Sequence, residues 1–153
     1  MFDTHVDTLY VWVALGAVSV AVFGVVASLP ASAPPDATTA ATTVDEVATS
    51  PPGSVATHEL DAEEWTLSGR AIGLRADGGV AHATVLDPYV PALGGRLAAV
   101  LAGAPPRRYF RSPAALGRAA ERARTADAEW RPAPERLRVR HVRWGGVDVV
   151  LAG

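Results

Sequence analysis

The sequence predicts an α+β fold in which one N-terminal transmembrane helix precedes a small antiparallel sheet, made of two hairpins plus an initial strand and covered by two short helices. Three observations lead to this prediction. Residues 8–29 contain no charged side chain. Glycine-containing turns at residues 76–79 and 145–146 each separate two strand-like segments, as in β-hairpins. Between the hairpins, residues 96–102 and the residues after Ser112 have apolar side chains at helical spacing.

The composition limits the chemistry that the chain can perform. The 153 residues suffice for one membrane anchor and one domain of about a hundred residues. Without cysteine there is no disulfide, thiolate metal site or thiol nucleophile. The net charge of −2 is unevenly distributed. Every arginine lies in residues 54–153, whereas the charged residues of segment 1–53 are all acidic. Such asymmetry points to surface partners and not to a particular fold.

Four segments follow from the pattern: an N-terminal tail over residues 1–7, a transmembrane helix over 8–29, a Pro/Thr/Ala-rich stalk over 30–53, and an α+β domain over 54–153. A helix over 8–29 would span roughly 33 Å, slightly more than the ~30 Å hydrocarbon core of a bilayer. The expected localisation is therefore a membrane, crossed once. A stalk of this composition is typical of extracytoplasmic linkers, so we expect the C-terminal domain outside the cytoplasm.

A cleaved signal peptide is the alternative interpretation of the N-terminal residues. Ala31-Ser32-Ala33 has the small residues of a signal-peptidase site. However, no basic residue precedes the apolar stretch, and the residue after the cut would be Pro34. A retained anchor is the favoured interpretation.

A short helix is predicted within the stalk, over residues 37–48. Asp36 is a candidate N-cap, and Pro51-Pro52-Gly53 would end the helix. Its threonines make it intrinsically weak, so it should form only if its apolar face docks on something. That face consists of Ala37, Ala40, Ala41, Val44, Val47 and Ala48.

The remaining domain has a first strand over residues 55–60, a hairpin over 71–86 and a second hairpin over 136–152. One helix should cover 96–102 and another should begin with Ser112 as N-cap and Pro113 at its first position. Three tryptophans are expected to pack at the core edges: Trp65, Trp130 and Trp144.

No catalytic constellation is evident. His58, His82 and His141 fall on three predicted strands and, with a carboxylate, could supply zinc ligands. Neither H-x-x-x-H nor H-E-x-x-H spacing occurs, and G-x-S-x-G, P-loop and G-x-G-x-x-G motifs are absent. We expect no catalytic, cofactor-binding or metal-binding residue, no cofactor and no enzymatic activity.

The arginine-rich segment RRYFR offers a candidate contact surface. Arginines surround Tyr109 and Phe110, an arrangement that can bind nucleic acid through phosphate contacts and stacking. An anionic headgroup or an acidic protein is favoured over nucleic acid. A plain solvated face ranks above both, because arginine is the chain's only strong base. The candidate contact residues are Arg107, Arg108, Arg111, Arg138, Arg140 and Arg143.

Residues 1–60 resemble an archaeal type IV pilin or pseudopilin, with a hydrophobic N-terminal stretch, the helical continuation VDEVATS, a PPGS break and the strand VATHEL. This resemblance implies a hydrophobic helix packed in a filament core and a displayed β-rich head. The sequence lacks the basic residue and glycine that prepilin peptidase recognises. In addition, Pro30, Pro34 and Pro35 interrupt the long helix of that family.

The whole chain is similar to an uncharacterised haloarchaeal family of short single-span proteins. The motifs are MFDTHVDTLYVW, SPPGSVATHELDA, RAIGLRADGGVAHATV, LAGAPPRRYFRSPAAL and WRPAPERL. This resemblance implies no active site, and it suggests pilus- or secretion-type assemblies.

The leading hypothesis is a non-enzymatic, single-pass membrane protein that serves as an accessory or pilin-like component of a cell-surface or secretion assembly. Its partners would be the lipid bilayer and other membrane, pilus or secretion proteins, and nucleic acid is not expected. One alternative is a tethered binding module whose arginine face holds an anionic ligand or acidic partner. A second is a tethered metal-dependent hydrolase that uses His58, His82 or His141.

Overall fold

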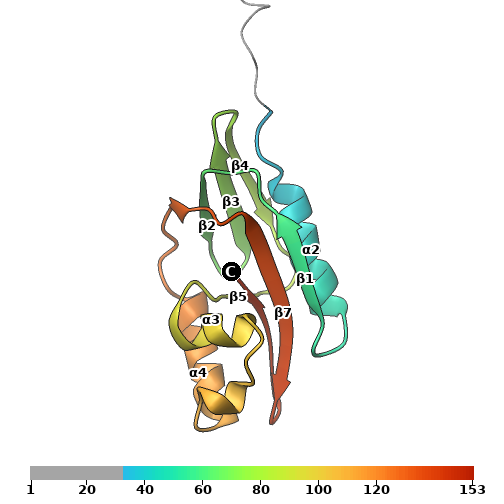
Figure 1. Ribbon diagram of the computed structural model, residues 1–153, viewed down its shortest axis with the longest axis vertical. Coiled ribbons are helices and arrows are strands. Elements are labelled where there is room, and N and C mark those ends of the chain that lie inside the picture. The colour runs from blue at the N-terminus through green and yellow to red at the C-terminus, as the bar shows by residue number, and fades with distance from the viewer. Residues whose placement is uncertain (1–32) are drawn as a thin grey trace, which may run out of the picture. The chain divides into compact units, whose positions relative to one another are not determined.

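Two four-stranded sheets share one helix in the computed structural model, which describes residues 33–153 (Figure 1). The helix, α2, contacts strands of both sheets. Along the chain the elements are α2 (Ala37–Thr49), β1 (Val55–Glu59), β2 (Glu64–Leu67), β3 (Ala71–Ala76), β4 (Gly79–Thr84), β5 (Val90–Pro91), α3 (Gly95–Leu101), the 3₁₀ turn η1 (Pro106–Arg108), α4 (Pro113–Arg124), β6 (Arg131–Pro132), β7 (Arg136–Trp144) and β8 (Val147–Ala152).

The first sheet has the strand order β1-β7-β8-β5, and the second has the order β4-β3-β2-β6. In the first sheet β7 pairs antiparallel with β1 and with β8, whereas β5 runs parallel to β8. In the second sheet β3 pairs antiparallel with β2 and β4, and β6 extends the sheet beyond β2. Chain order therefore does not match sheet order, because the first sheet joins segments from both ends of the described chain.

The predicted fold class is wrong in its single sheet. Both predicted hairpins form, as β3–β4 and β7–β8, but they belong to different sheets. The initial strand, β1, pairs with the second hairpin. Strands β2, β5 and β6 are missing from the prediction because they have only four, two and two residues, too few for an alternating pattern.

The predicted fold class also contained a transmembrane helix, which the described fold does not. Within residues 33–153, no helix has both the length and the apolar character to cross a membrane. The predicted tail over 1–7 and the helix over 8–29 lie outside the described residues. The corrected fold class is α+β, with two small sheets and three α-helices among residues 33–153.

Helix α2 begins at a side-chain cap, and its apolar face is buried. The Asp36 carboxylate accepts a hydrogen bond from the Thr39 backbone N–H at 2.9 Å. A hydrogen bond from the Thr39 hydroxyl, together with this backbone bond, holds the pKa of Asp36 below its usual value. The buried face of α2 consists of small apolar side chains, which let the helix backbone approach both sheets closely. Its members are Ala37, Ala40, Ala41, Val44 and Val47. Tertiary docking thus compensates for the weak helix propensity of the threonines.

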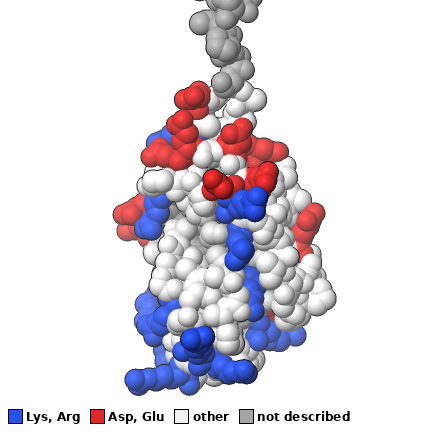
Figure 2. Space-filling view, in the orientation of Figure 1, with Lys and Arg blue, Asp and Glu red and all other residues white. Residues whose placement is uncertain are grey.

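The two ends of this unit differ in charge (Figure 2). Acidic side chains gather at the end where α2 begins and β1 ends, whereas arginines gather at the end formed by α3, η1 and α4. Strand β7 connects the two ends: Arg136 lies opposite Glu59, and Gly145, just past the other end of β7, lies against Pro113 at the start of α4. Nine residues at about 3.3 Å each place the ends of β7 roughly 25–30 Å apart.

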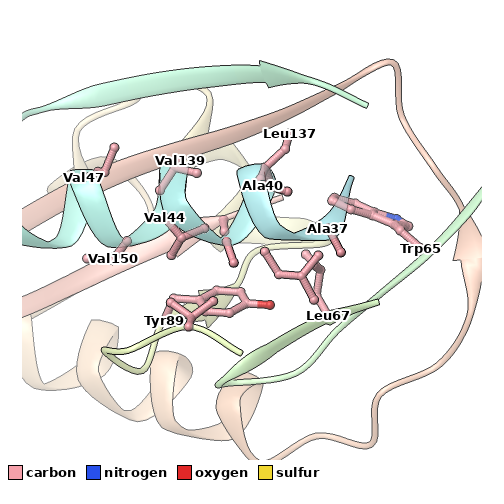
Figure 3. Close-up of a cluster of buried hydrophobic side chains, with 14 of the residues drawn as sticks. Ala37, Ala40, Val44, Val47, Trp65, Leu67, Tyr89, Leu137, Val139 and Val150 are labelled. Atoms are coloured by element: carbon pink, nitrogen blue, oxygen red, sulfur yellow. The ribbon is translucent and has the colours of Figure 1, made fainter. Parts of the chain in front are cut away.

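Alternate side chains of the first sheet enter two separate cores. On one face, residues such as Leu137, Val139 and Val150 join α2 and the second sheet in what we call the α2 core (Figure 3). On the opposite face, Val142 and Leu151 join α3, η1 and α4 in what we call the α4 core. Of the three tryptophans, Trp65 is buried in the α2 core, Trp144 packs against the α4 core, and Trp130 is half-buried.

Candidate functional site

The RRYFR segment divides into an inward and an outward set of side chains. Phe110 is 4% exposed and belongs to the α4 core, while Tyr109 is half-buried against the same core. Backbone bonds from Tyr109 and Phe110 to the Pro106 carbonyl hold the turn at 3.0 and 2.9 Å. Both aromatic residues therefore pack inward and anchor the turn, and only part of Tyr109 remains exposed.

The arginines of this segment point outward and are joined by arginines from both neighbouring helices. Arg107, Arg108 and Arg111 are exposed. Exposed Arg96, at the start of α3, places its guanidinium 5.4 Å from the centre of the Phe110 ring, a cation–π contact. Exposed Arg118 lies on α4. We call these five residues the basic end.

The basic end is electrostatically uncompensated within the part of the chain that the structure describes. None of its five guanidinium groups forms an ion pair with a carboxylate of residues 33–153. The desolvation cost that opposes buried ion pairs is small at such an exposed position. These guanidinium groups are free to receive carboxylate or phosphate oxygens in the bidentate geometry that arginine favours.

The three other predicted contact arginines are placed differently. Arg140 donates from Nη1 to the carbonyls of Val100 at 2.5 Å and Ala104 at 3.4 Å, so it neutralises the C-terminal end of α3. Arg143 donates to the Asp148 carboxylate from Nε at 2.7 Å and Nη2 at 2.5 Å. Arg138 is exposed on β7 and lines a pocket of about 410 Å³. The structure therefore brings together Arg107, Arg108 and Arg111, but not the six as one face.

The three candidate histidines do not converge. His82 is on the second sheet, where its ring meets Trp130 edge-on at 5.9 Å. His58 and His141 share the first sheet, but His58 lies opposite Leu137, four residues along β7 from His141. Among residues 33–153, no group of three potential metal ligands of the His, Asp or Glu type is found.

His141 is the one charged or polar residue of the described chain that is nearly buried, and it acts as a structural link. Its Nδ1 lies 2.7 Å from the Ser50 carbonyl, just past α2, and its Nε2 contacts the Asp148 carboxylate. Burial raises the pKa of Asp148, but hydrogen bonds from Arg143 and His141 outweigh this effect and hold the pKa below its usual value. The predicted second hairpin already brings Arg143 opposite Asp148, but the contact of His141 with Ser50 joins residues 91 positions apart and leaves no local pattern.

A pocket of about 480 Å³ adjoins this link, but its geometry does not form a catalytic triad. Both ring nitrogens of His141 already face acceptors. The Ser50 hydroxyl donates to the Glu46 carbonyl at 2.6 Å and is not the group that contacts the imidazole. No activated nucleophile therefore lines the pocket among its described residues, which include Ser50, Asp87, Arg124, His141 and Asp148.

The opposite end of the unit carries unpaired carboxylates. The connection between β1 and β2 is held by backbone bonds from Leu60 to Glu135 at 2.9 Å and from Glu63 to Arg75 at 2.8 Å. Four exposed acidic residues take part in these bonds or lie within two residues of them along the chain, and none of the four is ion-paired within residues 33–153. We call them the acidic end: Asp61, Glu63, Asp77 and Glu135.

Sequence reasoning missed Arg96 and Arg118 as members of the basic end, and it missed the acidic end altogether. The helical pattern predicts that Arg118 faces outward on its helix, but it does not predict that Arg118 joins the RRYFR arginines. Nothing local connects Arg96 to Arg107, because Arg96 reaches the RRYFR segment through a tertiary contact with Phe110.

A family model described as "Family of unknown function (DUF7283)" matches residues 3–142. No curated protein and no solved structure matches the chain. The family match agrees with the predicted membership of an uncharacterised family, and it assigns no role to any residue.

Proposed function

Because the chain belongs to the DUF7283 family, whose function is unknown, we propose a function from the chain's own residues. It is a non-enzymatic, membrane-anchored protein that serves as an accessory or pilin-like component of a cell-surface or secretion assembly. Its basic end contacts an acidic protein of that assembly, and residues 33–153 lie outside the cytoplasm.

One observation carries this proposal: the basic end combines exposed arginines with a rigid support and has no ion pair of its own within residues 33–153. Positive surfaces of this kind steer and orient an oppositely charged partner. Membrane attachment is supported only by the uncharged sequence of residues 8–29. The absence of enzymatic activity is part of the proposal and is supported by the scattered histidines described above.

Cross-linking in intact cells, followed by detergent extraction and purification of the full-length protein, tests the proposal. We expect the wild-type protein to be recovered with specific protein partners. An Arg107→Glu/Arg108→Glu variant should lose them, because like charges then face the acidic partner. Arg138→Glu is the control: it reverses one exposed arginine on β7, outside the basic end, and should retain the partners.

Two outcomes would overturn the proposed function. One is recovery of the full-length protein as a solitary monomer from its own membranes. The other is unchanged recovery of the partners with the Arg107→Glu/Arg108→Glu variant. Protease treatment of intact cells checks the location separately, since cleavage within residues 33–153 is expected only if they lie outside the cytoplasm.

A further inference from the structure

We propose that the acidic partner of the basic end is the acidic end of a second copy of this chain, so that copies join end to end. The inference rests on the proposed function, because it names the partner for the same surface. It is carried by the presence of two oppositely charged and unpaired surfaces at opposite ends of one folded unit (Figure 2).

The basic end is a preformed surface. Phe110 is buried in the α4 core and fixes the turn that carries Arg107, Arg108 and Arg111. The guanidinium of Arg96 lies over the same ring. Little backbone ordering should therefore be needed when carboxylates bind, which lowers the entropic cost of association.

The acidic end is preformed as well. The backbone of Glu63 bonds in both directions, from its N–H to the Arg75 carbonyl and from the Ala133 N–H to its carbonyl, both at 2.8 Å. Nearby Glu59 and Glu64 already pair with arginines of this chain, at 3.3 and 2.5 Å. The carboxylates of the acidic end have no such partner among residues 33–153, so they are available to another molecule.

The two surfaces cannot neutralise each other within one copy. The length of β7 places them roughly 25–30 Å apart. At physiological ionic strength the Debye length is about 8 Å, so the attraction between the two ends of one copy is largely screened. Contact between two copies brings the opposite charges within a few ångströms, where screening is weaker.

A second copy can pair with both charged surfaces, whereas a purely anionic ligand can pair with only one of them. Lipid headgroups or nucleic acid could neutralise the basic end, but they would leave the acidic end without a partner. Because the contact joins two different surfaces, it is heterologous, and the bound pair still presents one free basic end and one free acidic end. Such contacts propagate into chains of copies unless a rotation closes them into a ring.

Sedimentation of the full-length protein in uncharged detergent at low salt tests the inference. The wild type should form oligomers that grow with protein concentration and dissociate as salt is added. Arg107→Glu/Arg108→Glu and Asp61→Arg/Glu63→Arg should each weaken self-association by roughly tenfold or more, because each juxtaposes like charges. Arg138→Glu should leave it unchanged.

Mixing two charge-neutralised variants gives the sharpest result. Arg107→Gln/Arg108→Gln retains its acidic end, and Asp61→Asn/Glu63→Gln retains its basic end. One wild-type contact can therefore form between them, while the two weakened ends gain no charge of opposite sign that would attract a further copy, so we expect a 1:1 dimer. Circular dichroism checks that each variant is folded, and the neutralised variants replace any charge-reversed variant that is not.

The outcomes separate this inference from the proposed function. If the variants self-associate as the wild type does, or if the mixture forms no 1:1 dimer, the inference is wrong. If the wild type does not self-associate, but the Arg107→Glu/Arg108→Glu variant still loses the cellular partners, the partner is a different protein and the inference is wrong while the proposed function stands. If the basic end instead binds vesicles that contain anionic lipid while copies stay apart, headgroups are the occupant and the inference is again wrong.

Discussion

The α2 core and the α4 core lie on opposite faces of the first sheet, and they hold different things together. The α2 core joins both sheets through a single helix, so its buried side chains come from α2, from both sheets and from the segment that follows β4. The α4 core packs α3, η1 and α4 on the first sheet alone, and it supports the basic end. The difference indicates that one core determines the fold, whereas the other presents the charged surface.

Breaking the α2 core should have the largest effect. Val44 is fully buried between the sheets, and Val44→Asp would place an unpaired carboxylate there. We expect a loss of several kcal/mol of stability, enough to unfold the whole unit. Thr42→Asp places the same group on the exposed face of α2 and should be nearly neutral. Thermal unfolding of the full-length protein followed by circular dichroism distinguishes these results, and a folded Val44→Asp protein would contradict the role of this core.

Damage to the α4 core should be smaller and more local. Leu116 is fully buried on α4, and Leu116→Ala should cost about 2–5 kcal/mol through the cavity that it leaves. Hydrogen exchange should become faster in α3, η1 and α4 before it does so in β2 and β3. Uniformly faster exchange throughout residues 33–153 would show that the two cores unfold together and do not have separate roles.

Two glycine substitutions sharpen the comparison within the α4 region. Gly117 lies inside α4, and an added Cβ would meet Val147 at an ordinary 3.7 Å. Gly117→Ala should therefore stabilise the protein by about 0.5–1 kcal/mol. Gly145 has a φ of +53°, and its Cβ would lie 2.3 Å from a Pro113 side-chain carbon, so Gly145→Ala should destabilise it. Chemical denaturation measures the free energy of unfolding of both variants. Changes of the same sign in the two variants would contradict this packing.

The smallest effect should come from the link between α2 and the β7–β8 hairpin. The pKa of Asp148 is lowered in the folded state. Asp148 therefore contributes stability at pH values above its pKa in the unfolded chain, which is about 3.9. That contribution is lost as pH falls through the lower folded pKa. The stability difference between the wild type and Asp148→Asn should thus shrink from pH 6 to pH 3 in thermal melts. A difference independent of pH would mean that the carboxylate charge does not matter.

Local signals made part of the fold predictable. Asp77-Gly78 and Gly145-Gly146 mark hairpin turns, and Asp36 and Ser112 cap helices as expected. The partition of the hairpins between two sheets depends on contacts between distant segments, which leave no local pattern. Strands β5 and β6, with two residues each, contain Pro91 and Pro132 and resemble loops in sequence.

The candidate site was predictable to a similar extent. Arg107, Arg108 and Arg111 are close in sequence, so their shared surface follows from the chain itself. Arg140 binds the Val100 carbonyl, forty residues away, and is thereby engaged within the chain. Such long-range partners decide which arginines remain available, and a sequence pattern does not contain them.

The central claim is that the basic end binds a partner and contributes little to the fold. The most direct measurement follows partner recovery and thermal unfolding in the same preparation of the Arg107→Glu/Arg108→Glu protein. The account predicts that partner recovery is lost while the unfolding temperature stays within about a degree or two of the wild type, as expected for exposed surface changes. Retained partners, or a protein that loses partners only because it unfolds, would contradict it.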